Sequence, residues 1–505
     1  MKLDHRAGLG VAWALCGLIG CQSSEGGVEV KALGSAVGEG RPSDTPPPSA
    51  EDVAASEAAP TPESIHASGP DEMPSPSDAP PVALEVSAPG ASDMPPPVAG
   101  EPGTTADGTS HDSQDAKKVL LGRRLFEDRN LSASGTQSCA SCHDSARAFT
   151  GNNRGDDFLF PVATGAFEDQ HGGRNAPSAM YMAFSPTFAF VAEQGEDDEA
   201  IEFTPTGGQF WDGRADDLAA QARGPFLNPR EMALPNAGAV LERVQQADYA
   251  PLFREVFGAD AFLDGTAAYV NLSEAIAAFE STDTFSPFSS KFDAVLRGTA
   301  SFSSEEALGF SLFKDPEKGN CISCHVGDSE SQDPHDWLFT DFTYDNLGVP
   351  RNSLIADNAD VTHYDLGLCQ QENLLSRVPP GVADPRAFVD SLCGAFKVPT
   401  LRNVGKTAPY MHNGYFTGLR EVVEFYVTRE TNPSKWYPSA CDGTVQKYDD
   451  LPAEYHGNVN TEEVPYDRKL GEEPRLTASE IDAVVAFLRT LSDGYGEHGY
   501  LPATN

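Results

Sequence analysis

The chain has 505 residues, of which 76 are acidic and 35 are basic, so its formal net charge is −41. This charge argues against nucleic-acid binding, which requires a basic face to neutralise phosphates. Acidic residues occur throughout the chain, which favours solubility and is also compatible with a cationic redox partner.

The first residues have the features of an export signal. Basic Lys2 and Arg6 precede an apolar run at 9–20, which is too short to span a bilayer as a permanent helix. The run ends in LIGC at 18–21, which resembles a bacterial lipobox, in which the cysteine becomes the lipidated first residue. We expect residues 1–20 to be a lipoprotein signal peptide and the protein to be exported and anchored by lipid at Cys21 on the periplasmic side. An ordinary signal peptide cut nearby is the alternative. No later segment is a transmembrane candidate.

Residues 21–115 are dominated by Pro, Ala, Ser, Gly, Glu and Asp and contain almost no aromatic residue. A segment of this composition cannot bury enough apolar surface to offset its chain entropy, so we predict a disordered linker. It would act as a spacer between the lipid anchor and the folded body.

The folded body contains two pentapeptides of the form CxxCH, CASCH at 139–143 and CISCH at 321–325. Two thiols can bond the vinyl groups of one haem, and the adjoining imidazole can bind its iron, so each pentapeptide predicts one covalently bound haem c. A zinc ribbon would need its CxxC pairs much closer together in the chain. The predicted attachment residues are Cys139, Cys142 and His143 for the first haem and Cys321, Cys324 and His325 for the second.

Apolar residues with helical spacing precede both pentapeptides, at 121–128 and again at 308–315, so the chain contains two related haem-binding units. We expect a mainly α fold with two cytochrome c-like haem domains and long loops, preceded by the disordered linker. The N-terminal haem domain would span 116–300 and the C-terminal one 301–505.

Further helices are predicted at 218–222, 237–257, 267–280 and 304–313, and a last one follows a capping box at 477–480. Strand alternation is limited to short pieces in three long loops, at 151–173, 326–390 and 431–474. In an oxidising compartment Cys369 and Cys393 could form a disulfide that closes the second-domain loop. This pairing would leave Cys441 unpaired, and the other pairings stay open.

Several motifs between and after the haem sites carry a resemblance. FWDGR at 210–214 is followed by GP at 224–225 and NPREM at 228–232, and later by KVPTLRN at 397–403 and APYMHNG at 408–414. With these motifs the chain resembles the bacterial dihaem cytochrome c peroxidase family, including its MauG-like branch, over about residues 119–492. The resemblance implies a peroxidatic first haem, a second haem for electron transfer and storage, and His412 among the haem-binding residues.

Cleavage of a peroxide at an iron centre requires that a proton leave one oxygen and reach the other, and a nearby carboxylate can carry it. The resemblance implies Glu231 for this role, Gln221 for orienting peroxide or water, and Pro225 for shaping the pocket. A solvated loop acid is the alternative for Glu231. Trp211 resembles the tryptophan that carries electrons between the haems, and a large core residue is the alternative.

The family often holds a calcium ion between the haem domains, bound by one Asn side chain and by backbone carbonyls. Asn175, Thr407 and Pro409 match these positions. Oxygen ligands suit this hard cation.

Two positions depart from the classical members. At the position of the Met ligand of the second haem, counted from His412, this chain has Tyr426. A Tyr ligand there is typical of the MauG-like branch and favours ferric and higher oxidation states. An ordinary helix tyrosine, with Met411 as the ligand, is the alternative.

The second departure concerns the removable distal histidine of the classical members, whose position aligns with Ala166 or Phe167. His171 is nearby but offset. Either His171 serves through a shifted loop, or it lies on the surface and the first iron is open. An open iron needs no reductive activation, and the MauG-like branch works in that way, storing two oxidising equivalents across both haems.

We therefore expect a MauG-like dihaem oxidoreductase that reacts with hydrogen peroxide at the first haem. It would draw electrons through the second haem from a protein donor or from an oxidisable residue of a partner protein. A classical cytochrome c peroxidase that reduces H2O2 to water is one alternative. A non-catalytic dihaem electron carrier is another, but it does not explain Gln221 and Glu231 beside an open site.

Overall fold

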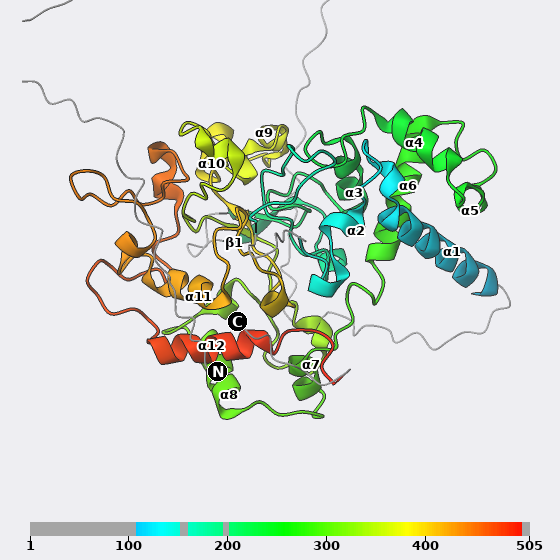
Figure 1. Cartoon of the computed structure of the whole chain (residues 1–505). Coiled ribbons are helices and arrows are strands. Elements are labelled where there is room, and N and C mark those ends of the chain that lie inside the picture. The colour runs from blue at the N-terminus through cyan, green and yellow to red at the C-terminus, as the bar shows by residue number, and fades with distance from the viewer. Residues whose placement is uncertain (1–107, 152–159, 195–200, 497–505) are drawn as a thin grey trace, which may run out of the picture. The chain divides into compact units, whose positions relative to one another are not determined.

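The computed structural model describes residues 108–151, 160–194 and 201–496 (Figure 1). The expected signal peptide and most of the expected linker lie outside these ranges. Helix α1 (Gly108–Glu127) extends into the segment expected to be linker. Its first turns are tied to a later helix, because the Gln114 side chain donates to the carbonyl of Val256 at 2.8 Å and Lys117 pairs with Glu255 at 2.7 Å.

The fold is mainly α-helical, as predicted. The first half contributes α1, α2 (Cys139–Cys142), α3 (Leu218–Leu227), α4 (Ala237–Gln246), α5 (Ala250–Phe257) and α6 (Gly265–Glu280). The second half contributes α7 (Lys291–Leu296), α8 (Ser304–Lys314), α9 (Leu374–Arg377), α10 (Pro385–Ser391), α11 (Leu419–Thr428) and α12 (Ala478–Arg489). Among the described residues the strands form two antiparallel pairs, β1 (Ala189–Gln194) with β2 (Ile201–Thr206) and β3 (Tyr344–Asp345) with β4 (Phe396–Lys397). None of the helices in the described ranges combines the length and apolarity needed to cross a bilayer.

Each half repeats one helix crossing. Helix α1 meets α6 at Gly122, where an added Cβ would lie 1.8 Å from the Ala275 carbonyl oxygen. Helix α8 meets α12 at Gly309, where an added Cβ would lie 1.9 Å from the Ala483 carbonyl oxygen. Only glycine allows two helices to approach so closely. In Figure 1 the two members of each pair lie side by side, which confirms the predicted repeat.

Each half also has its own hydrophobic cluster. The first includes Leu125 and Phe126 of α1 together with Phe279 of α6. The second includes Phe313 of α8 and Phe487 of α12, and also Phe292 of α7. Cys139 packs against the first cluster and Cys321 against the second, so each cluster supports one attachment site.

Two local predictions were wrong. The helix expected at 237–257 is interrupted after α4, because Tyr249 turns toward the end of α1 and donates a hydrogen bond to Asp128 at 2.6 Å. The pair β1–β2 lies outside the three loops in which strands were expected. Most of β1 is exposed on both faces, so its sequence lacks the alternation that marks a half-buried strand.

The long loop of the second half is closed by a disulfide between Cys369 and Cys393, which confirms the predicted pairing. The helices α9 and α10 lie on this loop, and Cys441 is exposed with a free thiol.

Candidate functional site

One cavity of about 780 Å³ has both haem motifs in its wall. All the residues singled out by the motifs contribute to this wall, although they come from distant parts of the chain. They are Cys139, Cys142, His143, Asn175, Trp211, Gln221, Pro225, Glu231, Cys321, Cys324, His325, Thr407, Pro409, His412 and Tyr426.

The two motif histidines are oriented by backbone carbonyls. Nδ1 of His143 lies 2.8 Å from the Phe149 oxygen, and Nδ1 of His325 lies 3.0 Å from the Phe339 oxygen. A proton on Nδ1 leaves Nε2 as the free lone pair that can bind iron. Burial lowers the pKa of both imidazoles, that of His325 to about 4, which keeps them neutral. Both sites therefore have the thiols and the imidazole tautomer that a covalent haem requires.

Helix α3 and the turn after it form one side of the cavity at the first motif. Asp217 caps α3 by accepting the Ala220 N–H at 2.8 Å, and Gln221 and Pro225 stand one turn apart on it. Glu231 follows, and its Oε1 accepts a hydrogen bond from the Asn228 amide at 2.8 Å. Burial raises the pKa of Glu231, and the positive charge of Arg214 partly offsets this rise. A buried carboxyl that can gain and lose a proton is suited to proton transfer.

His171 lies outside this cavity. It is exposed, and its Nδ1 is 3.4 Å from the Thr164 hydroxyl. Ala166 is buried with its N–H donated to the Glu231 carbonyl at 2.6 Å, and Phe167 is exposed. Among the described histidines, only His143, His325 and His412 line the cavity.

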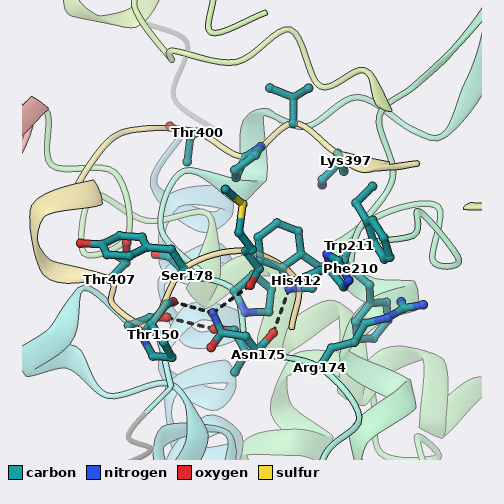
Figure 2. Close-up of a pocket in the computed structure, with 18 of the residues that line it drawn as sticks. Thr150, Arg174, Asn175, Ser178, Phe210, Trp211, Lys397, Thr400, Thr407 and His412 are labelled. Atoms are coloured by element: carbon teal, nitrogen blue, oxygen red, sulfur yellow. Dashed lines mark hydrogen bonds between the residues drawn. The ribbon is translucent and has the colours of Figure 1, made fainter. Parts of the chain in front are cut away.

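Trp211 is held between the two halves of the chain. Its indole N–H donates to the Asn175 carbonyl at 2.8 Å, and its own carbonyl accepts the Lys397 N–H at 2.8 Å. The Asn175 N–H in turn donates to the His412 carbonyl at 2.8 Å, and the His412 ring stacks on Phe396 with 3.6 Å between centroids. Figure 2 shows Asn175 close to His412, with Trp211 and Arg174 to one side.

The Asn175 side chain has an unusual environment. Its Nδ2 lies 2.7 Å from the Pro409 carbonyl and 3.3 Å from that of Met411, whereas its buried Oδ1 has no hydrogen-bond partner among the described residues. Within the described ranges, no group of three or more His, Cys, Asp or Glu side chains could hold a metal. A cation at this position would therefore need the Asn175 Oδ1 and the backbone carbonyls of Pro409 and Met411 as ligands. Rotating the Asn175 amide group by 180° would point Oδ1 toward these carbonyls.

Tyr426 projects from α11 toward the second haem motif. Tyr426 lines the cavity together with Cys321 and Cys324, and burial raises the pKa of its hydroxyl. Its ring lies 5.7 Å from that of Tyr466, and the Arg429 guanidinium is 4.8 Å from the Tyr466 ring. Two tyrosines therefore line this end of the cavity.

Two basic side chains in the cavity wall, Arg174 and Lys397, were given no role in the sequence analysis. Arg174 donates to Asp365 at 2.6 and 2.7 Å and to Asp212 at 2.6 Å. Burial alone would raise the pKa of Asp365, but Arg174 lowers it to about 2. Lys397 is buried and donates to the Gly208 carbonyl at 2.6 Å, and burial lowers its pKa to about 7. No motif links Arg174 to Asp365, because the two residues are far apart in the sequence.

Glu280 is a third missed residue. It ends α6, lines the cavity, and its buried Oε2 has no hydrogen-bond partner among the described residues. The repeated helix crossing matches Ala275 with Ala483, which makes Leu488 the counterpart of Glu280. Burial raises the pKa of this carboxyl to about 8, so it is mostly protonated at neutral pH. The repeated helix crossing, which only the structure shows, is what singles this residue out.

Replacing Glu280 by Leu should make the holoprotein more stable at high pH. Its folded-state pKa is about 8 against an ordinary 4.5. As the pH rises through this window the unfolded chain ionises while the folded one stays protonated, so the wild type loses stability. Glu280→Leu should remove this loss, raising the free energy of unfolding by about 1–4 kcal/mol at about pH 8 and less at about pH 5.

Urea unfolding of the wild type and of Glu280→Leu at both pH values measures this free energy. The exposed Glu242→Leu is the control, and an unchanged pH slope in Glu280→Leu would contradict the prediction.

Comparison with known proteins gives a consistent result. A model of the di-haem cytochrome c peroxidase family matches residues 116–301. The methylamine utilization protein MauG of Paracoccus denitrificans is 38% identical over 396 residues, which covers 77% of this chain and 92% of that protein. The cytochrome c551 peroxidase of Nitrosomonas europaea is 29% identical over 315 residues, or 62% of this chain and 73% of that protein. The crystal structure of the diheme peroxidase BthA from Burkholderia thailandensis is 37% identical with a TM-score of 0.67, covering 74% of this chain and 86% of that one.

Proposed function

The chain belongs to the dihaem cytochrome c peroxidase family that includes MauG, and from this premise we propose that it works in the MauG-like manner. Hydrogen peroxide would react at the first haem, and electrons would come through the second haem from a protein donor or from an oxidisable residue of a partner protein. Reduction of H2O2 to two molecules of water consumes two electrons and two protons. The observation that carries the proposal is the single cavity in which Glu231 and Gln221 lie at the first motif and Tyr426 at the second.

When bound, the two haems supply iron centres that accept and pass on oxidising equivalents. Glu231 takes the proton from the near oxygen of peroxide and returns it to the far oxygen as the O–O bond breaks. The Asn228 amide holds Glu231 Oε1, so the other carboxylate oxygen is free for this exchange. Gln221 orients peroxide or water from α3, and Pro225 shapes the same wall.

The exposed position of His171, outside the cavity, supports an open first iron. We propose Tyr426 as the outer ligand of the second iron, which its place in the cavity wall together with Cys321, Cys324 and His325 supports. We also propose a calcium ion beside Asn175, Thr407 and Pro409. The unpartnered Asn175 Oδ1 next to the Pro409 carbonyl supports this site.

We further propose that the protein is exported to the periplasm and anchored by lipid at Cys21. The disulfide between Cys369 and Cys393 supports an oxidising compartment. Cell fractionation tests the anchor: recovery with the membranes is expected, and recovery only with the soluble fraction would contradict it.

Trp211 is the proposed connection between the haems, so Trp211→Phe should slow the oxidation of an added donor. The Trp211 side chain bonds to Asn175 of the first half and the Trp211 backbone to Lys397 of the second. An indole is easily oxidised, whereas a phenyl ring is not. Resting protein is mixed with one equivalent of H2O2 and a reduced small cytochrome c. Stopped-flow absorbance then follows the reaction with peroxide and the oxidation of the cytochrome.

Trp436→Phe is the matched control, because Trp436 is buried in a second-half cluster away from the first motif. We expect slow donor oxidation in Trp211→Phe alone, with peroxide consumed at the normal initial rate. Equal donor rates in the wild type and in both variants would contradict the route through Trp211.

A further inference from the structure

The cavity meets the solvent close to Glu231. Thr164, Gly173 and Arg230 line the cavity and are also exposed, and the Arg230 side chain is 44% exposed. We take this exposed part of the wall as the entrance nearest Glu231, although the exposed residues Arg214 and Gln370 also line the cavity. A small molecule can therefore approach Glu231 past Thr164, Gly173 and Arg230.

A loop from the second half of the chain lies against this opening. We call residues 351–365 the mouth loop. Arg351 folds the loop on itself, because its guanidinium donates to the carbonyls of His363 and Asp360 at 2.7 Å each and to that of Asn358 at 3.3 Å. The mouth loop is therefore compact, and it is held to the second half by Arg351–Asp450 and Asn352–Asn413.

Two ion pairs fasten the mouth loop to the first half. Arg174 bonds both carboxylate oxygens of Asp365, and these side chains are only 18% and 19% exposed. Arg230 bonds both oxygens of Asp357, one of them at 2.9 Å, and these side chains are 44% and 26% exposed. Exposed ion pairs contribute little stability and are screened by salt, whereas breaking a buried pair is costly. Arg174–Asp365 is therefore the fixed attachment, and Arg230–Asp357 is the one that opens.

The Arg230–Asp357 ion pair lies next to Gly173, a residue of the cavity wall that has no side chain. A Cβ at Gly173 would lie 3.9 Å from Oδ2 of Asp357 and 4.0 Å from Nη1 of Arg230. Arg230 also directly precedes Glu231 in the chain, and an added Cβ at Gly165 would lie 2.2 Å from the Arg230 carbonyl oxygen. The backbone of Arg230 is thus packed against Gly165, and its side chain meets Asp357 next to the exposed wall at Gly173.

We propose that the Arg230–Asp357 ion pair determines which peroxides reach the first haem. Hydrogen peroxide passes while the pair is closed, and bulky organic hydroperoxides pass only when it opens. The mouth loop belongs to the second half, so the size of the accepted peroxide is set by a contact between the two halves. This inference rests on the proposed function of the first haem.

Ligand binding to the ferric holoprotein tests the inference without turnover. The rate of binding is measured by stopped-flow absorbance with cyanide as the small probe and 4-phenylimidazole as the bulky one. In Asp357→Ala the 4-phenylimidazole rate should rise roughly 2- to 5-fold, the change in open population that loss of an exposed ion pair allows. The cyanide rate should not change. At about 1 M salt the wild type should approach the variant, because the exposed pair is then screened.

Asp248→Ala is the matched control, since it breaks the exposed Arg124–Asp248 pair away from the cavity. If Asp357→Ala does not fold, Asp357→Asn removes the charge and keeps the size. Suppose that the wild type binds cyanide. Equal acceleration of both probes, or no acceleration of either, would then overturn this inference but not the proposed function. A wild type that binds neither probe has a closed first iron, and this result would overturn both the proposed function and the inference.

Discussion

Replacing Glu231 by Gln should slow the reaction with hydrogen peroxide by about 10²- to 10⁴-fold, the usual effect of losing a positioned proton carrier. A glutamine side chain has the size of glutamate and can still accept the Asn228 hydrogen bond, but it cannot take a proton. Burial raises the pKa of Glu231 above its ordinary value. The wild-type rate should therefore fall as the pH drops through that raised pKa and Glu231 becomes protonated, and the variant should lack this dependence. Stopped-flow absorbance over a pH series measures both.

Glu242→Gln is the control for the Glu231 experiment, because Glu242 is an exposed acid on α4 that does not line the cavity. It should leave the rate and the pH profile unchanged. A Glu231→Gln protein that reacts with peroxide as fast as the Glu242→Gln control would exclude Glu231 as the proton carrier.

Replacing Tyr426 by Phe should change the low-spin spectrum of the second haem and raise its midpoint potential by on the order of 0.1 V or more. Phenylalanine keeps the ring on α11 but has no oxygen with which to bind iron. An anionic oxygen ligand stabilises the ferric state, so its loss favours reduction. Spectroelectrochemical titration measures the potential, and electron paramagnetic resonance reports the ligand change.

Tyr466→Phe is the matched control, since Tyr466 is a second buried tyrosine in the same wall, 5.7 Å from Tyr426 between ring centroids. We expect a small effect there. If Tyr466→Phe changes the spectrum and Tyr426→Phe does not, the assigned ligand is wrong. Met411→Leu tests the remaining alternative and should leave the second-haem spectrum unchanged.

The sequence predicted the fold class, and it named residues that the structure brings together in one cavity. The chemistry of CASCH can be recognised locally, whereas FWDGR, NPREM and APYMHNG were identified through the family resemblance. The structure brings all of them to one cavity. The disulfide was also predictable, because a compartment that oxidises thiols leaves few ways to pair Cys369, Cys393 and Cys441.

The unpredicted features depend on contacts between distant residues. The break between α4 and α5 follows from Tyr249 reaching Asp128, and the mouth loop is held by Arg230–Asp357 and Arg174–Asp365. Periodicity within a short window carries no information on such pairs. Glu280 is a further case, because its alignment with Leu488 depends on the helix contacts made by Gly122 and Gly309.

The central claim is that the first iron is open and reacts with peroxide directly. The most direct test is electron paramagnetic resonance and absorption spectroscopy of the resting ferric holoprotein before and after one equivalent of H2O2, with no reductant added. We predict a high-spin ferric component that disappears on peroxide addition. Two low-spin hexacoordinate signals in the resting protein, together with no reaction until the second haem has been reduced, would contradict this account.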